Sequence, residues 1–159
     1  MTNNKDIENK KQDAPSNLYE GMLAFQSLSV AAVKSGKNPA FKSNYATLEA
    51  VIEAVEQAHQ FGLCFMQHIE YERGVNGETL AFVRTVVIHA PSGQTNDQTV
   101  VPIFLGKAHN PMQALGSGIT YAKRYGLQSA FGLPSEDDDA DGANVNGGQP
   151  IKVTQTSEW

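Results

Sequence analysis

The chain has 159 residues, and 40% of them are hydrophobic, which fits a single domain with a packed core and polar tails. It contains no apolar run long enough to cross a membrane, and residues 1–11 lack the apolar segment of a secretory signal. The net charge of −5 argues against a strongly basic domain, and the single cysteine, Cys64, excludes an internal disulfide.

The negative charge is concentrated at one end of the chain. Between Ser16 and Pro134 the acidic and basic residues are equal in number, so this part is formally neutral. An acidic run follows Pro134, formed by Glu136, Asp137, Asp138, Asp139 and Asp141. Because binding depends on local potential rather than on total charge, the composition is compatible with a nucleic-acid partner.

The N-terminal part predicts a polar arm followed by a helix. Residues 1–15 are polar and end in Ala14-Pro15, which is typical of a disordered arm. Ser16 is placed to cap a helix that runs to about Lys34, with Gly36 as its stop. Its expected inner face carries Leu18, Met22, Phe25 and Ser29. Residues 38–45 should form a loop, because Pro39 disfavours helical angles at the residue before it.

A second helix is expected from about Ala46 to Gln60, where Gly62 ends it. Its two faces differ in character. The apolar face carries Leu48, Ile52, Val55 and His59, and the acidic face carries Glu49, Glu53 and Glu56. We expect the acidic face to point away from any DNA, since carboxylates repel phosphates.

Three strands should follow as an antiparallel meander. Residues 63–71 alternate in hydrophobicity, with Leu63, Phe65, Ile69 and Tyr71 on one side and Gln67 as the polar exception. Residues 79–90 form the strongest strand pattern in the chain. After a turn at residues 91–94, a third strand runs to about Phe104, and Pro102 indicates that it ends there or lies at an edge.

A third helix is predicted between Asn110, which caps it, and Tyr125 or Gly126. Its apolar stripe should be Met112, Leu115, Ile119 and Ala122. Gly116 and Gly118 lower helix stability, so we expect a close backbone approach there. Residues 127–133 read as a short apolar closing segment, and residues 135–159 as an acidic and then Gly/Asn-rich tail.

These elements define an α+β domain over residues 16–134, in which helices pack on a three-stranded antiparallel sheet. The domain lies between the arm, residues 1–15, and the tail, residues 135–159.

Two stretches combine cations, aromatic rings and small polar residues, which suits phosphates and base faces. They are residues 38–46 (NPAFKSNYA) and residues 116–125 (GSGITYAKRY). Each could instead contribute ordinary core and surface residues. The candidate DNA-binding residues in and around them are Lys37, Phe41, Lys42, Asn44, Tyr45, Gln113, Ser117, Thr120, Tyr121, Lys123, Arg124 and Tyr125. Ala114 and Gly118 are candidates for contact between subunits.

Other sites have less support. The acidic run offers oxygen ligands for Mg²⁺ or Ca²⁺, but a flexible tail cannot hold carboxylates in fixed positions, so a solvated tail is favoured. A third interpretation is that the tail mimics DNA and competes for the basic groove. His59, Cys64 and His68 lack the CxxC pair that would indicate zinc. No hydrolase triad motif and no phosphate-binding loop is present in the sequence.

The chain resembles the essential recombination function (ERF) family of phage proteins. Residues 38–46 with the following helical segment are similar to its first signature, residues 116–125 to its second, and residues 134–142 (PSEDDDADG) to its acidic close. The three blocks occur in the right order, and the resemblance covers about residues 18–142. Relatives often carry a longer C-terminal region than this chain does.

The resemblance implies a protein without enzymatic activity that anneals single-stranded DNA in homologous recombination and uses no ATP. It implies a βββα core like that of other strand annealers, a homo-oligomeric ring or filament, and the cytoplasm of a bacterial host. The expected partners are single-stranded DNA, the annealed duplex, a phage exonuclease and a single-strand-binding protein. No cofactor is expected, and Mg²⁺ enters only as a counterion of DNA. The alternatives are a passive single-strand coat, a metal-dependent nuclease using the acidic run, and a structural scaffold.

Overall fold

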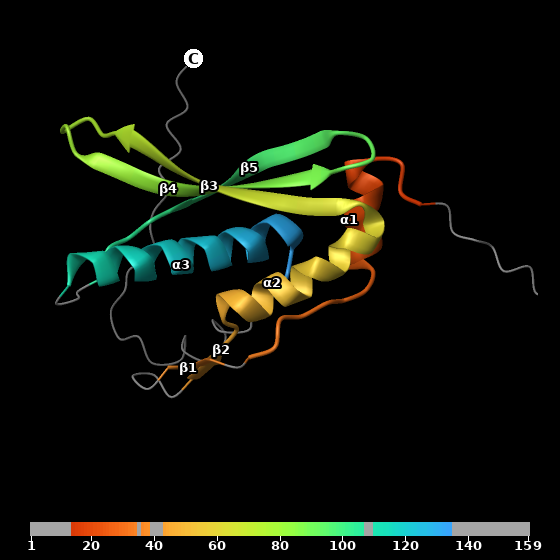
Figure 1. The fold of residues 1–159 in the computed structure, drawn as a ribbon, viewed down its shortest axis with the longest axis horizontal. Coiled ribbons are helices and arrows are strands. Elements are labelled where there is room, and N and C mark those ends of the chain that lie inside the picture. Colours follow the sequence, from red (N-terminus) through yellow and green to blue (C-terminus); the bar gives the residue numbers. More distant parts are fainter. Residues whose placement is uncertain (1–13, 35, 39–42, 107–109, 135–159) are drawn as a thin grey trace, which may run out of the picture.

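A computed structural model describes residues 14–34, 36–38, 43–106 and 110–134. The arm up to residue 13 and the tail from residue 135 therefore lie outside the described residues. Figure 1 shows a three-stranded sheet with helices on one of its sides. In chain order the elements are α1 (Leu18–Gln26), β1 (Gly36–Asn38), β2 (Ser43–Tyr45), α2 (Leu48–Glu56), the 3₁₀ helix η1 (Gln57–Phe61), β3 (Leu63–Arg73), β4 (Thr79–His89), β5 (Gln94–Pro102) and α3 (Pro111–Phe131).

The predicted antiparallel meander is confirmed. β4 pairs with β3 on one side and with β5 on the other, and the strand order is β3-β4-β5. The register between β4 and β5 shifts between Thr85 and Val87. Alternate residues of β4, among them Val83, Thr85 and Val87, are buried under the helices. β5 ends at Pro102 and forms an edge of the sheet, as the proline indicates.

α3 is longer than predicted. The side chain of Asn110 accepts a hydrogen bond from the Met112 amide (2.9 Å), and Gly132 ends the helix in the left-handed region at φ 65°. Residues 127–131, predicted as part of a separate closing segment, are the last turns of this helix. Leu127 and Phe131 are one turn apart and fully buried, so core packing extends the helix past Gly126.

The buried face of α3 also differs from the prediction. Ala122, which was predicted on the apolar stripe, is buried, but Ala114 and Gly118 are buried beside it, and Met112 of the predicted stripe is 72% exposed. The reason is that small residues let the helix lie close to the sheet, while a long side chain would hold it away.

α1 is shorter than predicted and begins one residue later. The side chain of Asn17, not that of Ser16, accepts a hydrogen bond from the Glu20 amide (3.0 Å). The helix ends at Gln26, because the Ser27 hydroxyl donates to the Leu23 carbonyl (2.7 Å) and Ser29 has a positive φ of 51°. Ser29, expected on the inner face, is therefore exposed and outside the helix.

α2 begins at Leu48 behind a Thr47 cap, and its predicted continuation to Gln60 is the 3₁₀ helix η1. Gly62, with φ 74°, ends η1 as predicted. The buried residues are Val51, Ala54, Val55 and Ala58, so the prediction that His59 faces inward is wrong. The tighter turn of a 3₁₀ helix rotates His59 to the surface. Glu49, Glu53 and Glu56 are exposed, as expected.

The predicted loop over residues 38–45 is partly a short hairpin. β1 and β2 pair antiparallel, with Gly36 opposite Tyr45 and Lys37 opposite Asn44. A Cβ atom on Gly36 would lie 2.6 Å from the Tyr45 ring, so the ring lies directly against the glycine backbone. Residues 39–42 lie outside the described residues.

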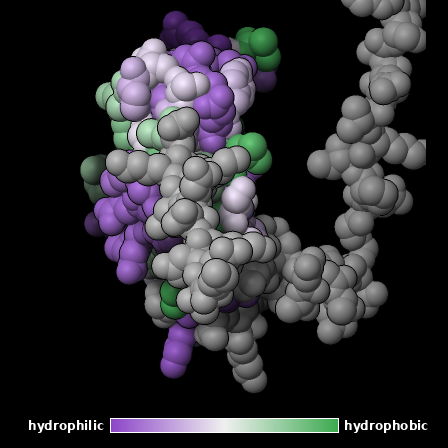
Figure 2. All heavy atoms as spheres, turned by 90° about the vertical axis from the view of Figure 1, so that its right-hand side faces the viewer, coloured by the Kyte–Doolittle hydropathy of each residue, from purple (hydrophilic) through white to green (hydrophobic). Residues whose placement is uncertain are grey.

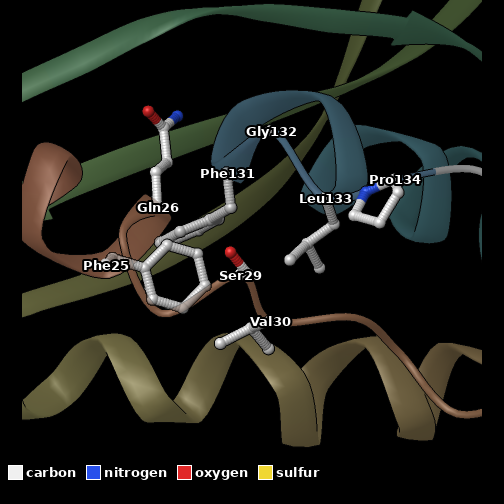
Figure 3. Close-up of a pocket in the computed structure, with 8 residues that line it drawn as sticks. All are labelled: Phe25, Gln26, Ser29, Val30, Phe131, Gly132, Leu133 and Pro134. Atoms are coloured by element: carbon white, nitrogen blue, oxygen red, sulfur yellow. The ribbon is translucent and has the colours of Figure 1, made fainter.

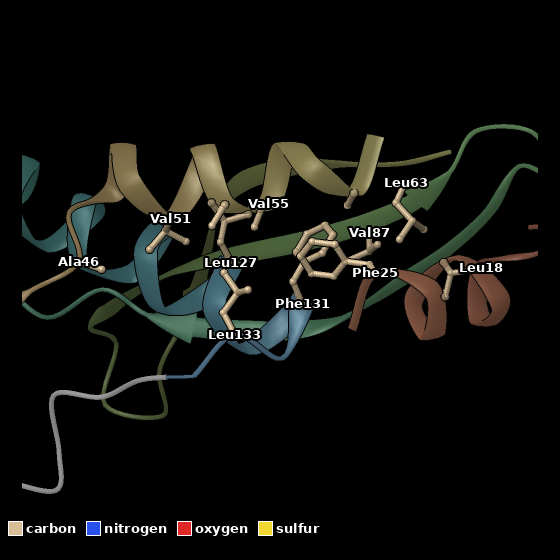
Figure 4. Close-up of a cluster of buried hydrophobic side chains, with 12 residues drawn as sticks. Leu18, Phe25, Ala46, Val51, Val55, Leu63, Val87, Leu127, Phe131 and Leu133 are labelled. Atoms are coloured by element: carbon tan, nitrogen blue, oxygen red, sulfur yellow. The ribbon is translucent and has the colours of Figure 1, made fainter. Parts of the chain in front are cut away.

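The core forms between the sheet and two layers of helix. α3 packs directly on the sheet, α2 packs on the far side of α3, and α1 closes the end where β3 begins (Figure 1). Figure 4 shows side chains from all of these elements meeting in one cluster. Phe131 is at its centre, with its ring edge-on to Phe25 (5.6 Å between centroids) and to Phe65 (6.2 Å). This packing fixes the end of α3 relative to α1 and β3.

Candidate nucleic-acid interface

The two stretches singled out in the sequence meet at Arg124. Its Nη1 atom donates a hydrogen bond to the Ala46 carbonyl (2.9 Å), across 78 positions of sequence. Its guanidinium carbon lies 4.8 Å from the ring centroid of Tyr45, 4.8 Å from that of Tyr121 and 5.0 Å from that of Tyr125. We refer to these four side chains as the arginine–tyrosine cluster. It joins the β1–β2 hairpin to the middle of α3.

Helical spacing places two of the rings side by side. Tyr121 and Tyr125 are four residues apart on α3, with centroids separated by 6.3 Å and planes inclined by 24°. Their side chains are 51% and 41% exposed, so part of each ring remains open to a ligand. Tyr45 is half-buried between the hairpin and Arg124. Exposed aromatic rings held in fixed orientation are a platform on which bases can stack.

Arg124 is itself almost inaccessible. It is 5% exposed, and its Nε atom has no hydrogen-bond partner among the described residues. Among the described residues, no carboxylate forms an ion pair with Arg124. The tyrosine rings and the Ala46 carbonyl therefore supply the negative potential around this cation. Its geometry suits bracing the rings rather than projecting into solvent.

A groove of about 500 Å³ lies beside the cluster, between α3 and the segment that follows β5. Tyr121 and Tyr125 line it from the helix, and Phe104 and Leu105 line it from residues 101–106. Phe104 is 77% exposed and Leu105 is 66% exposed. Both residues were missed in the sequence: Phe104 was predicted as the end of the third strand, and Leu105 was given no role. Their position in the sequence could have indicated them, because both are large and apolar and stand between Pro102, where the edge strand ends, and Gly106.

The bottom of the groove depends on Gly118. A Cβ atom at this position would lie 2.6 Å from the Phe104 carbonyl oxygen and 3.0 Å from the Ile103 side chain. The close approach that the glycine predicts is thus found within the subunit. Ala114 is buried on the same face of α3. Packing inside the chain accounts for both residues that the sequence suggested for contact between subunits.

The two helix glycines provide a matched pair of variants. Gly118→Ala should destabilise the fold by about 1–3 kcal/mol, because the new methyl group meets backbone that cannot move freely. Gly116→Ala should stabilise it by about 0.5–1 kcal/mol, since no atom of the described residues lies within 4 Å of the new atom and alanine favours a helix. Urea unfolding of both variants measures the difference, and equal stabilities would show that the Phe104 contact is not tight.

The other predicted site residues are placed as follows. Lys37 is exposed on the hairpin, opposite Asn44. Lys123 is half-buried, and its carbonyl accepts a hydrogen bond from the Gln67 amide (2.9 Å). The predicted polar residues Gln113, Ser117 and Thr120 are exposed on α3, and of these three only Ser117 lines the groove. Thr120 donates to the Gly116 carbonyl (2.9 Å). Phe41 and Lys42 lie outside the described residues.

The remaining surface features are less suited to a polyanion. A second cavity of about 170 Å³ lies between the end of α1 and the end of α3, and Figure 3 shows Phe25, Val30, Phe131 and Leu133 around it. None of the described residues that line this cavity carries a charged side chain. Figure 2 shows the end of the molecule where α1 lies, and its visible described surface is mostly hydrophilic.

The described part of the chain contains neither a cluster of metal ligands nor a helix that could span a membrane. Within residues 14–34, 36–38, 43–106 and 110–134, no group of three or more histidine, cysteine or acidic side chains is arranged to hold a metal ion. His59, Cys64 and His68 therefore form no such group. The acidic run, Glu136 to Asp141, lies outside the described residues. None of the helices in the described part of the chain is long and apolar enough to cross a membrane.

One ion pair lies across β3 and β4. Arg84 donates to both Glu70 carboxylate oxygens, at 2.8 Å and 3.0 Å. The hydrogen bond from Arg84 is the main cause that holds the pKa of Glu70 below its usual 4.5. A carboxylate with a lowered pKa in the folded state stabilises the protein above the unfolded pKa, and this contribution is lost as the pH falls through the folded value.

Glu70→Gln should accordingly have a lower unfolding midpoint than the unmodified chain at neutral pH. The difference should shrink as the pH falls below 4.5, where protonation breaks the pair in the unmodified chain as well. Thermal unfolding at a series of pH values measures this. A difference that stays constant from neutral to acidic pH would contradict the assignment.

The fold and the site define a small α+β protein with an aromatic surface suited to nucleic-acid bases. The chain belongs to the ERF superfamily, whose sequence model matches residues 18–158. This is a family of phage recombination and single-strand annealing proteins. Comparison with curated proteins and with solved structures gives no match.

Proposed function

We propose that this protein binds single-stranded DNA and anneals complementary strands in phage homologous recombination. The observation that carries the proposal is the arginine–tyrosine cluster, in which the two family-like stretches meet at one surface. Membership of the ERF superfamily supports the same conclusion independently.

The site residues divide into three roles. Three rings stack on bases: Tyr121, Tyr125 and the accessible part of Tyr45. Stacking tolerates any base sequence, because every base has a π-face. Lys37 and Lys123 attract the backbone phosphates. Arg124 is a positioning residue that holds the tyrosines in place, since its burial leaves little of the guanidinium for a phosphate. This role replaces the direct phosphate contact expected from the sequence.

Annealing then needs no catalytic group. The first strand lies on the aromatic surface with most of its base edges open to an incoming strand. Base pairing supplies the free energy, so neither ATP nor a bound metal is required, and Mg²⁺ acts only as a counterion of the DNA.

Because the body of the chain is formally neutral, a single subunit should bind weakly. Assembly of many subunits on one strand converts weak contacts into tight binding by raising the effective concentration. The proposal therefore includes a ring or filament that acts in the bacterial cytoplasm, after an exonuclease and together with a single-strand-binding protein.

The experiment follows duplex formation between two complementary labelled oligonucleotides, with and without the purified protein and without ATP. The proposal predicts faster duplex formation than the oligonucleotides show alone. A passive coat would bind the strands and slow their pairing. Cleavage products that appear only with divalent metal would indicate a nuclease instead, and the absence of binding would indicate a scaffold.

A further inference from the structure

The groove beside the arginine–tyrosine cluster has the size of a binding pocket. Its volume of about 500 Å³ falls within the range of clefts that hold small molecules. The rings of Tyr121 and Tyr125 line it on one side, and Phe104 and Leu105 line it on the other. A flat group that enters the groove would meet aromatic or apolar surface on both sides.

Two contacts within the chain hold the groove in this shape. The backbone of Phe104 lies so close to Gly118 that a Cβ atom there would be 2.6 Å from its carbonyl oxygen. On the other side, the Arg124 guanidinium packs against both tyrosine rings at 4.8 Å and 5.0 Å. The groove is therefore formed before any ligand arrives, which lowers the entropic cost of binding.

The chemistry of the groove lining favours a DNA base over a phosphate. Among the described residues, the lining carries hydroxyl groups, from Ser117 and the two tyrosines, but no charged side chain. A phosphate would lose its hydration in such a groove without gaining a cation, whereas a planar base would lose little and gain stacking. The exposed cation Lys37 lies on the hairpin, outside the groove, where a phosphate can remain hydrated.

We propose that each subunit draws one base of the bound strand out of the base stack and into this groove. The inference rests on the proposed function and extends it, because it states which part of the strand enters which surface. Stacking rather than hydrogen bonding holds the base, so the groove accepts all four bases. The captured base is hidden from the incoming strand, while its neighbours remain available for pairing.

The test compares two oligonucleotides of equal length and charge, oligo(dT) and an abasic strand in which tetrahydrofuran replaces each base. The unmodified protein should bind oligo(dT) about tenfold or more tightly, which is the scale of one stacked base. Phe104→Ala should lower this ratio several-fold, because the groove then keeps only the stacking surface of Tyr121 and Tyr125. Phe104 is largely exposed, so the variant should fold, and its unfolding midpoint is measured alongside.

Met112→Ala is the matched control, since Met112 is also large, apolar and exposed but does not line the groove. It should keep the full preference for oligo(dT). A Phe104→Ala variant that keeps the preference would overturn the inference while leaving annealing intact. So would a loss of subunit assembly in Phe104→Ala without DNA, seen by sedimentation, because the groove would then hold a second copy of the chain. Failure of the unmodified protein to bind either oligonucleotide would instead overturn the proposed function.

Discussion

Replacing Arg124 with alanine is expected to lower both the stability of the fold and the affinity for single-stranded DNA. The variant leaves the Ala46 carbonyl without its donor and removes the cation that packs against three tyrosine rings. A buried carbonyl without a donor and the lost cation–π contacts together should cost about 2 kcal/mol of unfolding free energy. Affinity should fall about tenfold or more, because the rings are no longer held in one arrangement.

The salt dependence of binding separates a positioning role from a phosphate contact. Since Arg124 is 5% exposed, Arg124→Ala should leave the slope of log affinity against log salt unchanged. Lys37→Ala is the control, because Lys37 is exposed on the adjoining hairpin. It should reduce the slope by about 0.7, the value for one phosphate of a single strand, and leave stability within about 0.5 kcal/mol. A flatter slope and normal stability for Arg124→Ala would show that its guanidinium binds phosphate directly.

The second large effect is expected at the stacked tyrosines. Tyr121→Ala and Tyr125→Ala should each weaken binding of single-stranded DNA by about 1–3 kcal/mol, the cost of removing one stacking ring. Annealing of labelled oligonucleotides should slow in parallel, because fewer subunits occupy each strand. The phenylalanine variants keep the ring and should retain most of the affinity. Fluorescence anisotropy with one oligonucleotide measures all four variants.

Tyr19 provides the control for this pair, since it is an exposed tyrosine on α1 and is not one of the rings packed against Arg124. Tyr19→Ala should bind single-stranded DNA as the unmodified protein does. If Tyr121→Phe and Tyr125→Phe lost as much affinity as the alanine variants, hydroxyl hydrogen bonds rather than stacking would hold the strand.

The fold class could be predicted because its signals are local. Alternation along β4 and the glycine and proline residues at element ends identify the meander and the order of the helices. Helix ends were less accurate, because side-chain caps and core packing decide them. α3 runs on to Phe131 since Leu127 and Phe131 complete the core.

The candidate site was only partly visible in the sequence. The aromatic and basic composition pointed to Tyr45, Tyr121 and Tyr125, but composition cannot show that Arg124 lies buried among them. That position depends on contacts between residues far apart in the chain. The groove was missed for the same reason, since Phe104 meets α3 only in the folded protein.

The central claim is that the hairpin and the middle of α3 form one surface for an unpaired strand. Hydrogen–deuterium exchange of the protein, with and without saturating oligo(dT), tests this most directly. We expect slower amide exchange on binding in the two separate regions at once, residues 36–46 and residues 103–125. Slower exchange at the acidic face of α2 or elsewhere, with neither of these regions affected while the strand is bound, would contradict the account.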